Sequence, residues 1–125
     1  MQINLSNTNE TLELVTSVAG SLHYKIGYTD ITTTSVTNPS VSRGIITPAA
    51  TTTVLSSPAA STTRKIQYIN VFNNGTNTNI ITVQEDIAGV KNINQKVSLQ
   101  TGETLRIVND VVSVLDVSGR VKLQN

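Results

Sequence analysis

The feature that most constrains this chain is the alternation of Val and Ile with Thr, Ser and Asn over nearly its whole length. β-Branched side chains at every second position fit a pleated, half-buried strand, because successive side chains of a strand point to opposite faces of the sheet. Thr, Ser and Asn together make up about a third of the residues. The alternation therefore predicts an all-β fold.

Eight to ten strands are expected from this alternation and from turn residues that recur at short spacing. Residues 11–17 could instead form a helix, but Val15 and Thr16 are poor helix formers. In 64–73, Ile66, Tyr68 and Phe72 share one predicted face while the other face is also apolar, which indicates a central strand or one covered by a neighbouring subunit. The predicted strands are 11–17, 22–29, 43–47, 52–56, 64–73, 79–85, 90–99, 104–108, 111–117 and 120–123.

Turn residues separate these strands. Asn73-Asn74-Gly75 predicts a hairpin turn with positive φ that joins 64–73 to 79–85. Further turns are expected at Ile87-Ala88-Gly89, Thr101-Gly102 and Ser118-Gly119. The stretch 32–63, rich in Thr, Ser and Pro, is interpreted as ordered loops with short strands, with a disordered linker as the alternative.

Many short strands and no convincing helix predict an antiparallel β-sandwich of jelly-roll-like type. An immunoglobulin-like sandwich and a small closed barrel are the alternatives, since periodicity does not reveal strand order. The expected organisation is an N-terminal arm or edge strand over residues 1–10, followed by a single sandwich domain over residues 11–125.

The apolar content is low for a globular core. Hydrophobic residues make up 38% of the chain and aromatic residues 3%, whereas apolar residues usually amount to about 45–50%. Either part of the chain is poorly packed loop, or neighbouring copies complete the fold. The even spread of the low content along the chain favours an oligomer.

Charge and hydropathy limit the expected partners. Nine basic and eight acidic residues are scattered singly along the sequence, so no nucleic-acid partner is expected. Uninterrupted apolar runs stay far below the ~20 residues of a membrane-spanning helix, so no membrane partner is expected either. The first residues lack the pattern of a signal peptide, which predicts assembly in a cytoplasm.

Residues suited to catalysis or metal binding are scarce. The chain has no Cys and a single His, His23, which is too little for a zinc or iron site. His23 lies in a predicted strand, and no Gly-x-Ser-x-Gly motif accompanies it. Glu85 and Asp86 should point to opposite faces of their strand, and a calcium site made from them with Asn79 would lack a ligand loop. No catalytic residue, metal or cofactor is therefore predicted, and the chain is not expected to be an enzyme.

Sugar-binding aromatic platforms are not expected, because the aromatic residues lie in strand phase with aliphatic ones. This pattern is more typical of core residues than of a binding site. The residues concerned are Tyr24, Tyr28, Tyr68 and Phe72.

The order of several segments resembles a family of small virion structural proteins of tailed bacteriophages. Each pattern is a turn or strand motif, and the resemblance depends on their succession over about 110 residues from Leu12 onward. A Trp or Tyr that often precedes the closing motif in this family is replaced here by valines. The matching segments are Tyr28-Thr29-Asp30, Pro58–Thr62, the Arg-x-Ile that begins 64–73, Gly102–Leu105 and Leu115–Arg120.

The resemblance implies a non-enzymatic component of a virus particle without indicating the head, neck or tail. The leading hypothesis is a capsid decoration (cement) protein that binds the major capsid protein lattice, forms a homotrimer and resides in the virion. A head-fibre, neck or tail component is the alternative, and a carbohydrate-binding module is a distant one.

Polar, mostly uncharged residues in the first ten residues and in the Thr-rich loops are the expected contacts to the capsid or to other subunits. These segments are long enough to add strands to a neighbour. The candidate contact residues are Gln2, Asn4, Asn7, Asn9, Thr33, Asn38 and Arg43.

Overall fold

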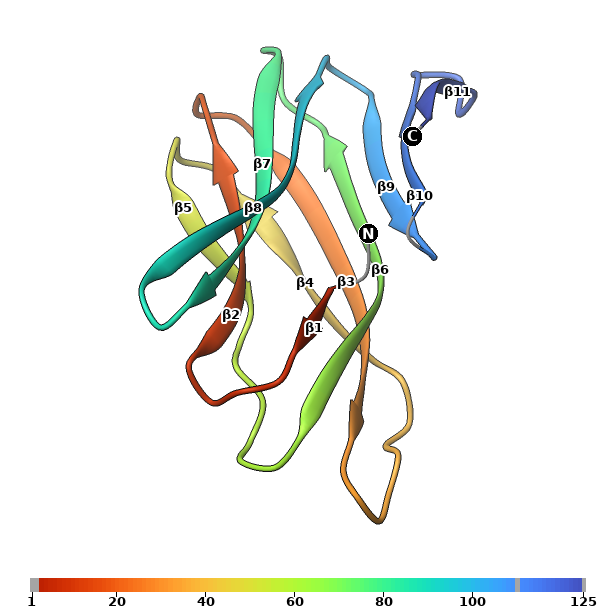
Figure 1. The fold of residues 1–125 in the computed structure, drawn as a ribbon. Helices are drawn as coiled ribbons and strands as arrows, with labels where there is room; N and C mark the ends of the chain where they lie inside the picture. Colours follow the sequence, from red (N-terminus) through yellow and green to blue (C-terminus); the bar gives the residue numbers. More distant parts are fainter. Residues whose placement is uncertain (1–2, 110, 125) are drawn as a thin grey trace.

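A computed structural model describes residues 3–109 and 111–124, which form β-strands joined by turns and loops and contain no helix (Figure 1). The described residues therefore include no helix that could cross a membrane. In chain order the strands are β1 (Asn4–Leu5), β2 (Glu10–Thr16), β3 (Leu22–Ile31), β4 (Ser40–Ile46), β5 (Thr51–Leu55), β6 (Thr63–Asn73), β7 (Asn79–Ile87), β8 (Val90–Leu99), β9 (Thr104–Val108), β10 (Val111–Leu115) and β11 (Val121–Gln124).

The strands form two antiparallel sheets, so the predicted all-β sandwich is confirmed. The large sheet has the order β11-β10-β9-β6-β3-β4, and β1 pairs with β6 beside it. The small sheet has the order β5-β2-β7-β8. Along the chain, the paired strands β3 and β6 of the large sheet lie between the paired strands β2 and β7 of the small sheet. The choice between a jelly roll and an immunoglobulin-like arrangement stays a prediction.

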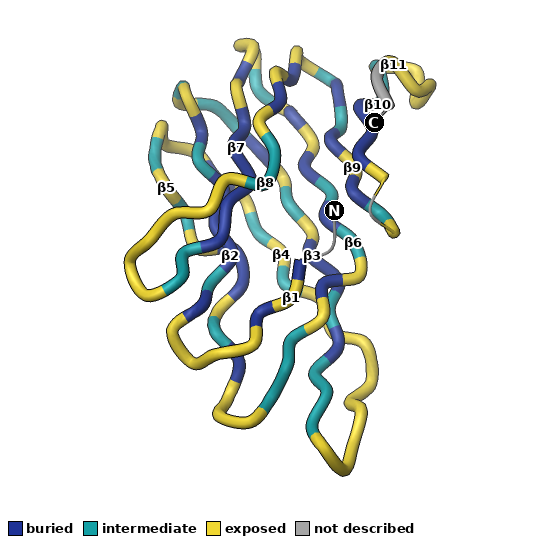
Figure 2. The backbone as a smooth tube through the Cα atoms, viewed as in Figure 1, coloured by how far each residue is buried: buried dark blue, intermediate teal, exposed yellow. Residues whose placement is uncertain are grey.

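Buried residues occur in strands of both sheets (Figure 2). The core between the sheets is built from aliphatic side chains. Leu12 and Leu14 of β2 face Ile26 of β3 and Ile69 of β6, and all four are fully buried. The folded chain exposes 6605 Å², and a compact monomer of this mass exposes about 6,500 Å². A single chain therefore encloses its own core, and any oligomer must arise from its surface.

The first described residues belong to the large sheet. Ile3 and Leu5 are buried, and β1 pairs with β6 at Lys65 and Arg64. The Glu10 carboxylate accepts hydrogen bonds from the Ser6 backbone N–H at 2.6 Å and from Asn7 Nδ2 at 2.8 Å. These bonds close the β1–β2 turn and attach the N-terminal residues 3–9 to the sandwich.

The hairpin predicted at Asn73-Asn74-Gly75 is wrong. β6 belongs to the large sheet and β7 to the small one, so this connection crosses between the sheets. Neither Asn74 nor Gly75 has a positive φ. The buried Asn73 amide instead donates to the Asn77 and Leu99 carbonyls at 2.9 Å each, while its Oδ1 accepts from the Gly75 N–H at 3.0 Å. These side-chain bonds hold the crossover in place of a strand ladder.

Other predicted turns and strands are confirmed. Ala88 (φ 54°) and Gly89 (φ 89°) form the two-residue turn between β7 and β8, which is the conformation of a type I′ hairpin. Gly119 has a φ of 81° in the turn that precedes β11. The strands expected at 43–47 and 52–56 correspond to β4 and β5, so much of the stretch 32–63 is ordered.

The prediction that all four aromatic residues belong to the core is wrong for Tyr68 and Phe72. A β-bulge in β6 pairs Tyr68 with Gly27 and Ile66 with Tyr28, so that Gln67 is the extra residue. A bulge shifts the phase of alternation by one residue. Ile66 therefore points into the core with Ile69 and Val71, whereas Tyr68 and Phe72 lie on the outer face. The prediction of a central strand is confirmed, because β6 has neighbours along both edges.

Candidate functional site

Strand register gathers charged residues on the outer face of the large sheet. Arg43 of β4 is paired with Lys25 of β3, and Lys25 with Asn70 of β6. Asn70 is in turn paired with Arg106 of β9. Paired residues on one face lie about 5 Å apart at Cβ, so these four side chains form one row across the sheet. We call this set the basic row.

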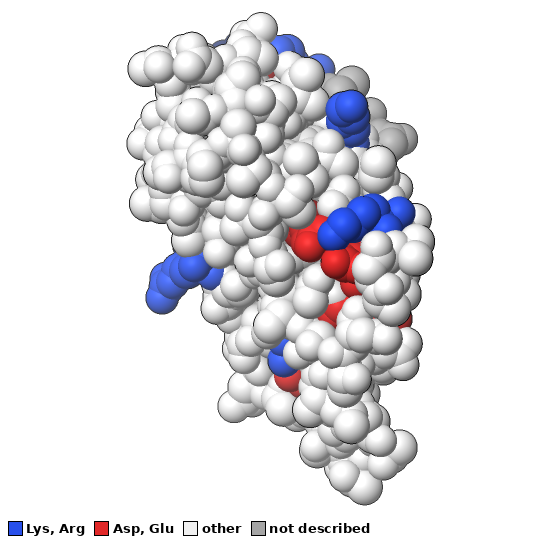
Figure 3. All heavy atoms as spheres, turned by 90° about the vertical axis from the view of Figure 1, so that its left-hand side faces the viewer, with Lys and Arg blue, Asp and Glu red and all other residues white. Residues whose placement is uncertain are grey.

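The cations of the basic row have no carboxylate partner among the described residues. Described carboxylates that form ion pairs do so elsewhere: Asp30 with Arg64, Glu13 and Asp86 with Lys91, and Glu103 with Lys122. Figure 3 shows a different side of the molecule, where red and blue atoms meet in the centre and most of the surface is uncharged. The scattered cations of the sequence are thus partly gathered in space, and this gathered set is not neutralised.

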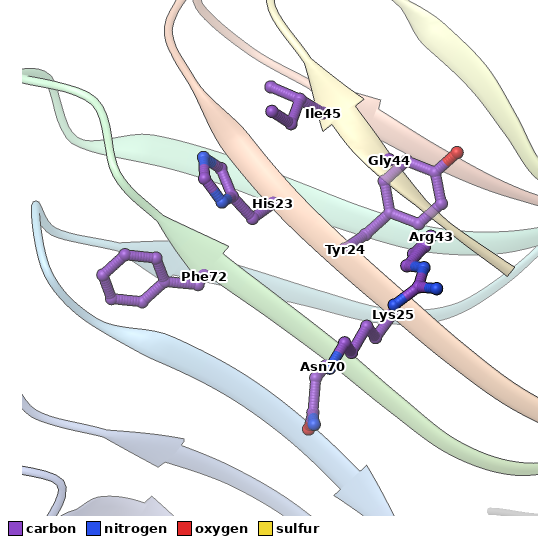
Figure 4. Close-up of a pocket in the computed structure, with 8 residues that line it drawn as sticks. All are labelled: His23, Tyr24, Lys25, Arg43, Gly44, Ile45, Asn70 and Phe72. Atoms are coloured by element: carbon purple, nitrogen blue, oxygen red, sulfur yellow. The ribbon is translucent and has the colours of Figure 1, made fainter. Parts of the chain in front are cut away.

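Apolar and aromatic side chains flank the basic row. Ile45, His23 and Phe72 lie on one side of it in register. The His23 and Phe72 rings are 6.2 Å apart at their centroids and nearly perpendicular, at 81°. Together with Lys25 and Arg43 they line an open hollow of about 340 Å³ (Figure 4).

A second hollow of about 430 Å³ lies on the other side of the basic row. Tyr68 is the aromatic residue of this second hollow. Lys25 and Asn70 line both hollows. The two hollows therefore form one continuous surface. The residues that line the second hollow are Lys25, Gln67, Tyr68, Asn70, Arg106, Val108 and Asn109.

The Tyr68 ring lies with its face on the backbone of β3. A Cβ atom added at Gly27 would come within 2.2 Å of Tyr68 Cε1 and within 2.6 and 2.7 Å of the two adjacent ring atoms. The three distances differ by only a few tenths of an ångström, so the added Cβ would lie above the plane of the Tyr68 ring. A Cβ in the plane of the ring, outside its edge, would lie much farther from the two adjacent ring atoms than from Cε1. The absence of a side chain at Gly27 thus lets the ring lie flat, with its other face turned outward.

His23 lies on the outer face of β3, beside Phe72 of β6. Its ring contacts Phe72 and its strand neighbours on the outer face are Lys25 and Ile45. No hydrogen bond or ion pair joins His23 to a hydroxyl or carboxylate group of another described residue. Its position is that of a surface side chain beside the basic row.

Glu85 and Asp86 point to opposite faces, as their adjacency predicts. Glu85 is buried, and its burial raises its pKa above the ordinary value despite a hydrogen bond from Asn94. Asp86 lies outside, where the Lys91 ammonium and the Gly89 N–H lower its pKa. Asn79 is at the far end of β7, and its side chain bonds to the backbone of residues 17 and 18. The described residues contain no group of three His, Cys, Asp or Glu that could hold a metal ion.

A bidentate ion pair joins the end of β3 to the start of β6. Arg64 donates from Nε and Nη2 to the two Asp30 oxygens at 2.8 and 2.9 Å, and from Nη1 to the Ser56 carbonyl at 2.8 Å. Its guanidinium also lies 4.7 Å from the centroid of the Tyr28 ring. The Arg64 hydrogen bonds hold the pKa of Asp30 below its usual value. These groups have a structural role, because each of the three guanidinium nitrogens donates a hydrogen bond within the chain.

The candidate contact residues from the sequence lie in three separate places. Asn4 is in β1, and Asn7 and Asn9 are in the β1–β2 turn next to Ala88, whose N–H donates to the Asn9 carbonyl. Thr33 and Asn38 are exposed near the tip of the β3–β4 hairpin, which projects beyond the sandwich (Figure 1).

Of these candidates, Arg43 belongs to the basic row, and Gln2 is outside the described residues. The structure does not bring these candidates into one site. Sequence reasoning missed Lys25, Tyr68 and Arg106, because their proximity depends on the order of β3, β6 and β9. The Gly27 and Tyr68 pairing has a sequence signal, a glycine inside a strand, which indicates a close approach of another group.

Comparisons with protein-family models, with curated protein sequences and with solved structures found no match to this chain. The structure itself defines an antiparallel β-sandwich protein. The outer face of its large sheet carries cations that form no ion pair with a described residue, between the row of Ile45, His23 and Phe72 and the hollow that contains Tyr68.

Proposed function

We propose that the chain is a non-enzymatic structural protein of a tailed-bacteriophage particle, and specifically a capsid decoration protein that binds the major capsid protein lattice and stabilises the head. The order of motifs in the sequence supports a role as a component of a phage particle. The observation that carries the decoration role is the exposure of branched apolar side chains on edge strands.

Edge strands offer two kinds of contact to a neighbouring chain. Val41 and Ile45 on β4 are 48% and 59% exposed, and Val90 and Ile93 on β8 are 69% and 62% exposed. β4 and β8 are edge strands of the large and the small sheet. An edge strand also has a row of backbone groups without a partner in its own sheet, which can pair with another chain. Apolar side chains beside such a row favour a protein neighbour over water.

The closed aliphatic core suits this role. A protein that reinforces a shell under internal pressure must transmit force without unfolding, and a sandwich of paired strands with a dry core provides such rigidity. In this proposal the trimer and the shell contact both use the exposed edges, while the core of each copy remains its own.

The test is the stoichiometry of the chain in purified particles of the phage that encodes it. Heads and tails are separated, and copies of the chain per major capsid protein are counted by quantitative mass spectrometry. A decoration protein should occur on heads in numbers that match a lattice position, and heads without it should release DNA at a lower temperature. Confinement to tails or necks, or absence from particles, would overturn the proposal.

A pair of variants links the result to the edge strands. Ile45→Lys places a charge on edge strand β4 and should abolish binding to heads that lack the chain. Ile80→Lys is the matched control, because Ile80 is also exposed but lies on β7, which is paired on both sides. Equal binding of both variants would exclude the β4 edge as a contact.

A further inference from the structure

We propose that the outer face of the large sheet binds an acidic oligosaccharide, with a carboxylate-bearing sugar ring stacked on Tyr68 and its carboxylate paired with Lys25 or Arg106. This binding activity goes beyond the structural role proposed above. The site is the second hollow, whose volume of about 430 Å³ lies within the range of small-ligand sites, about 300–1,000 Å³.

Tyr68 supplies a flat apolar platform. Its ring face lies on Gly27, so the ring is held parallel to the sheet and its outer face is free for contact. The C–H face of a pyranose ring is apolar and broad, and it packs against an aromatic face with little loss of hydrogen bonding. Because the glycine backbone supports the ring, the platform is formed before the ligand arrives, which reduces the entropic cost of binding.

Polar groups surround this platform in the arrangement that a sugar requires. The side chains of Gln67, Asn70 and Asn109 line the same hollow and can donate to or accept from hydroxyl groups. Asn70 Oδ1 is buried and has no hydrogen-bond partner in the structure. A buried amide oxygen without a hydrogen-bond partner destabilises the fold, and rotation of the Asn70 side chain toward a ligand hydroxyl would supply the missing hydrogen bond.

The charge of the face selects an acidic ligand. Lys25 and Arg106 lie on either side of Asn70 in register, and neither forms an ion pair with a described residue. A carboxylate above Asn70 would lie between two cations on a rigid sheet. A second copy of this face is a poor partner, because an isologous contact would set one basic row against another.

Two other acidic partners fit less well. Single-stranded nucleic acid needs a succession of stacking platforms and a longer basic track, whereas His23 and Phe72 are nearly perpendicular and cannot both lie flat. An extended acidic peptide binds by pairing with a free strand edge. The Tyr68 site lies between β3, β6 and β9, where the strands already pair with one another.

The test measures binding of defined acidic oligosaccharides to the full chain by isothermal titration calorimetry. The probes are hexagalacturonate, hexamannuronate and 3′-sialyllactose, and methyl-esterified hexagalacturonate is the uncharged counterpart of the first. Binding of at least one acidic probe is expected, with at least tenfold weaker binding once its carboxylates are esterified. Oligothymidylate and poly-glutamate serve as the nucleic-acid and peptide competitors.

Variants assign the binding to the site. Tyr68→Ala and Arg106→Gln should each weaken binding at least tenfold, whereas Lys96→Gln, on the outer face of the small sheet, should leave it unchanged. Circular dichroism of each variant separates loss of binding from loss of fold. The proposal is overturned if no acidic probe binds, if Lys96→Gln weakens binding as much as Arg106→Gln, or if oligothymidylate or poly-glutamate binds more tightly than every saccharide.

Discussion

Tyr68 covers Gly27 on the neighbouring strand, and a methyl group at position 27 would lie 2.2 Å from the tyrosine ring. A ring that lies flat on a strand in this way requires glycine beneath it. The same relationship occurs on the inner face, where a Cβ at Gly44 would lie 2.7 Å from the Tyr24 hydroxyl. Two strand glycines of this chain are thus explained by tyrosines on the adjacent strand.

Gly27→Ala should displace the Tyr68 ring and lower the free energy of unfolding by about 1 kcal/mol. In a Tyr68→Ala background the same change should be neutral or should stabilise by about 0.5 kcal/mol, because glycine within a strand is unfavourable when nothing covers it. Urea unfolding of the four proteins in this double-mutant cycle measures the coupling. Additive effects would show that the ring does not depend on the glycine.

Much of this architecture follows from the sequence, and the exceptions have physical causes. Alternation locates the strands and predicts two half-buried sheets, because burial of one face imposes a period of two. Alternation does not reveal the β6 bulge at Gln67, so the prediction that Ile66 shares a face with Tyr68 and Phe72 is wrong. The connection at Asn73-Asn74-Gly75 has hairpin chemistry, but pairing of β6 with β3 and β9 takes precedence over the local turn preference.

The basic row could not be predicted from spacing along the chain. Lys25, Arg43 and Arg106 are isolated in the sequence, and only the antiparallel register of β3, β4, β6 and β9 brings them together. Their charge favours an exposed position for each of them. The sequence does not contain the strand order that makes them neighbours.

Arg64→Leu should lower the free energy of unfolding at pH 7 by about 3 kcal/mol, because it leaves the partly buried Asp30 carboxylate without its partner. The folded-state pKa of Asp30 is lowered from 3.8, chiefly by the Arg64 hydrogen bonds. The ion pair therefore stabilises the fold fully at pH values above the ordinary pKa of Asp30. This contribution is lost as the pH falls through the lower folded-state pKa. Unfolding of both proteins between pH 7 and pH 2 should show the difference shrinking in acid. A constant difference would exclude the ion pair as its cause.

Glu85→Gln should raise the melting temperature at pH 7. Burial raises the folded-state pKa of Glu85 from 4.5, so the protonated form stabilises the fold in acid and this benefit is lost as the pH rises through the folded-state pKa. Glutamine stays neutral at every pH, so the variant should have the higher melting temperature at pH 7. This difference should disappear near pH 4, where Glu85 is itself protonated.

Glu103→Gln is the control for this prediction, because burial opposes ionisation of Glu103 but hydrogen bonds from Lys122 and Gln100 N–H lower its pKa overall. It should lower the melting temperature at pH 7. The same direction of change in both variants would contradict the assignment of the two carboxylates.

Asn79→Ala should lower the free energy of unfolding by about 2–3 kcal/mol. The buried Asn79 amide donates to the Val18 carbonyl at 2.9 Å and its oxygen accepts from the Ser17 N–H at 2.9 Å, so truncation removes two hydrogen bonds that join β7 to the segment after β2. Asn92→Ala, at an exposed position of β8, is the control and should change stability by less than about 0.5 kcal/mol. Urea midpoints measured at one pH compare the two, and similar losses would show that Asn79 has no special role.

The most direct test of the account is the mass of the purified chain in solution, measured by light scattering behind a sizing column. The account predicts a homotrimer of about 40 kDa, three chains of 13.4 kDa, assembled through exposed edges of closed sandwiches. On dilution the trimer should dissociate without loss of the β-sheet circular dichroism signal, because each chain encloses its own core. A monomer at all concentrations would contradict assembly through the edges, and a ring of six or twelve copies would contradict decoration of the head in favour of the neck or tail.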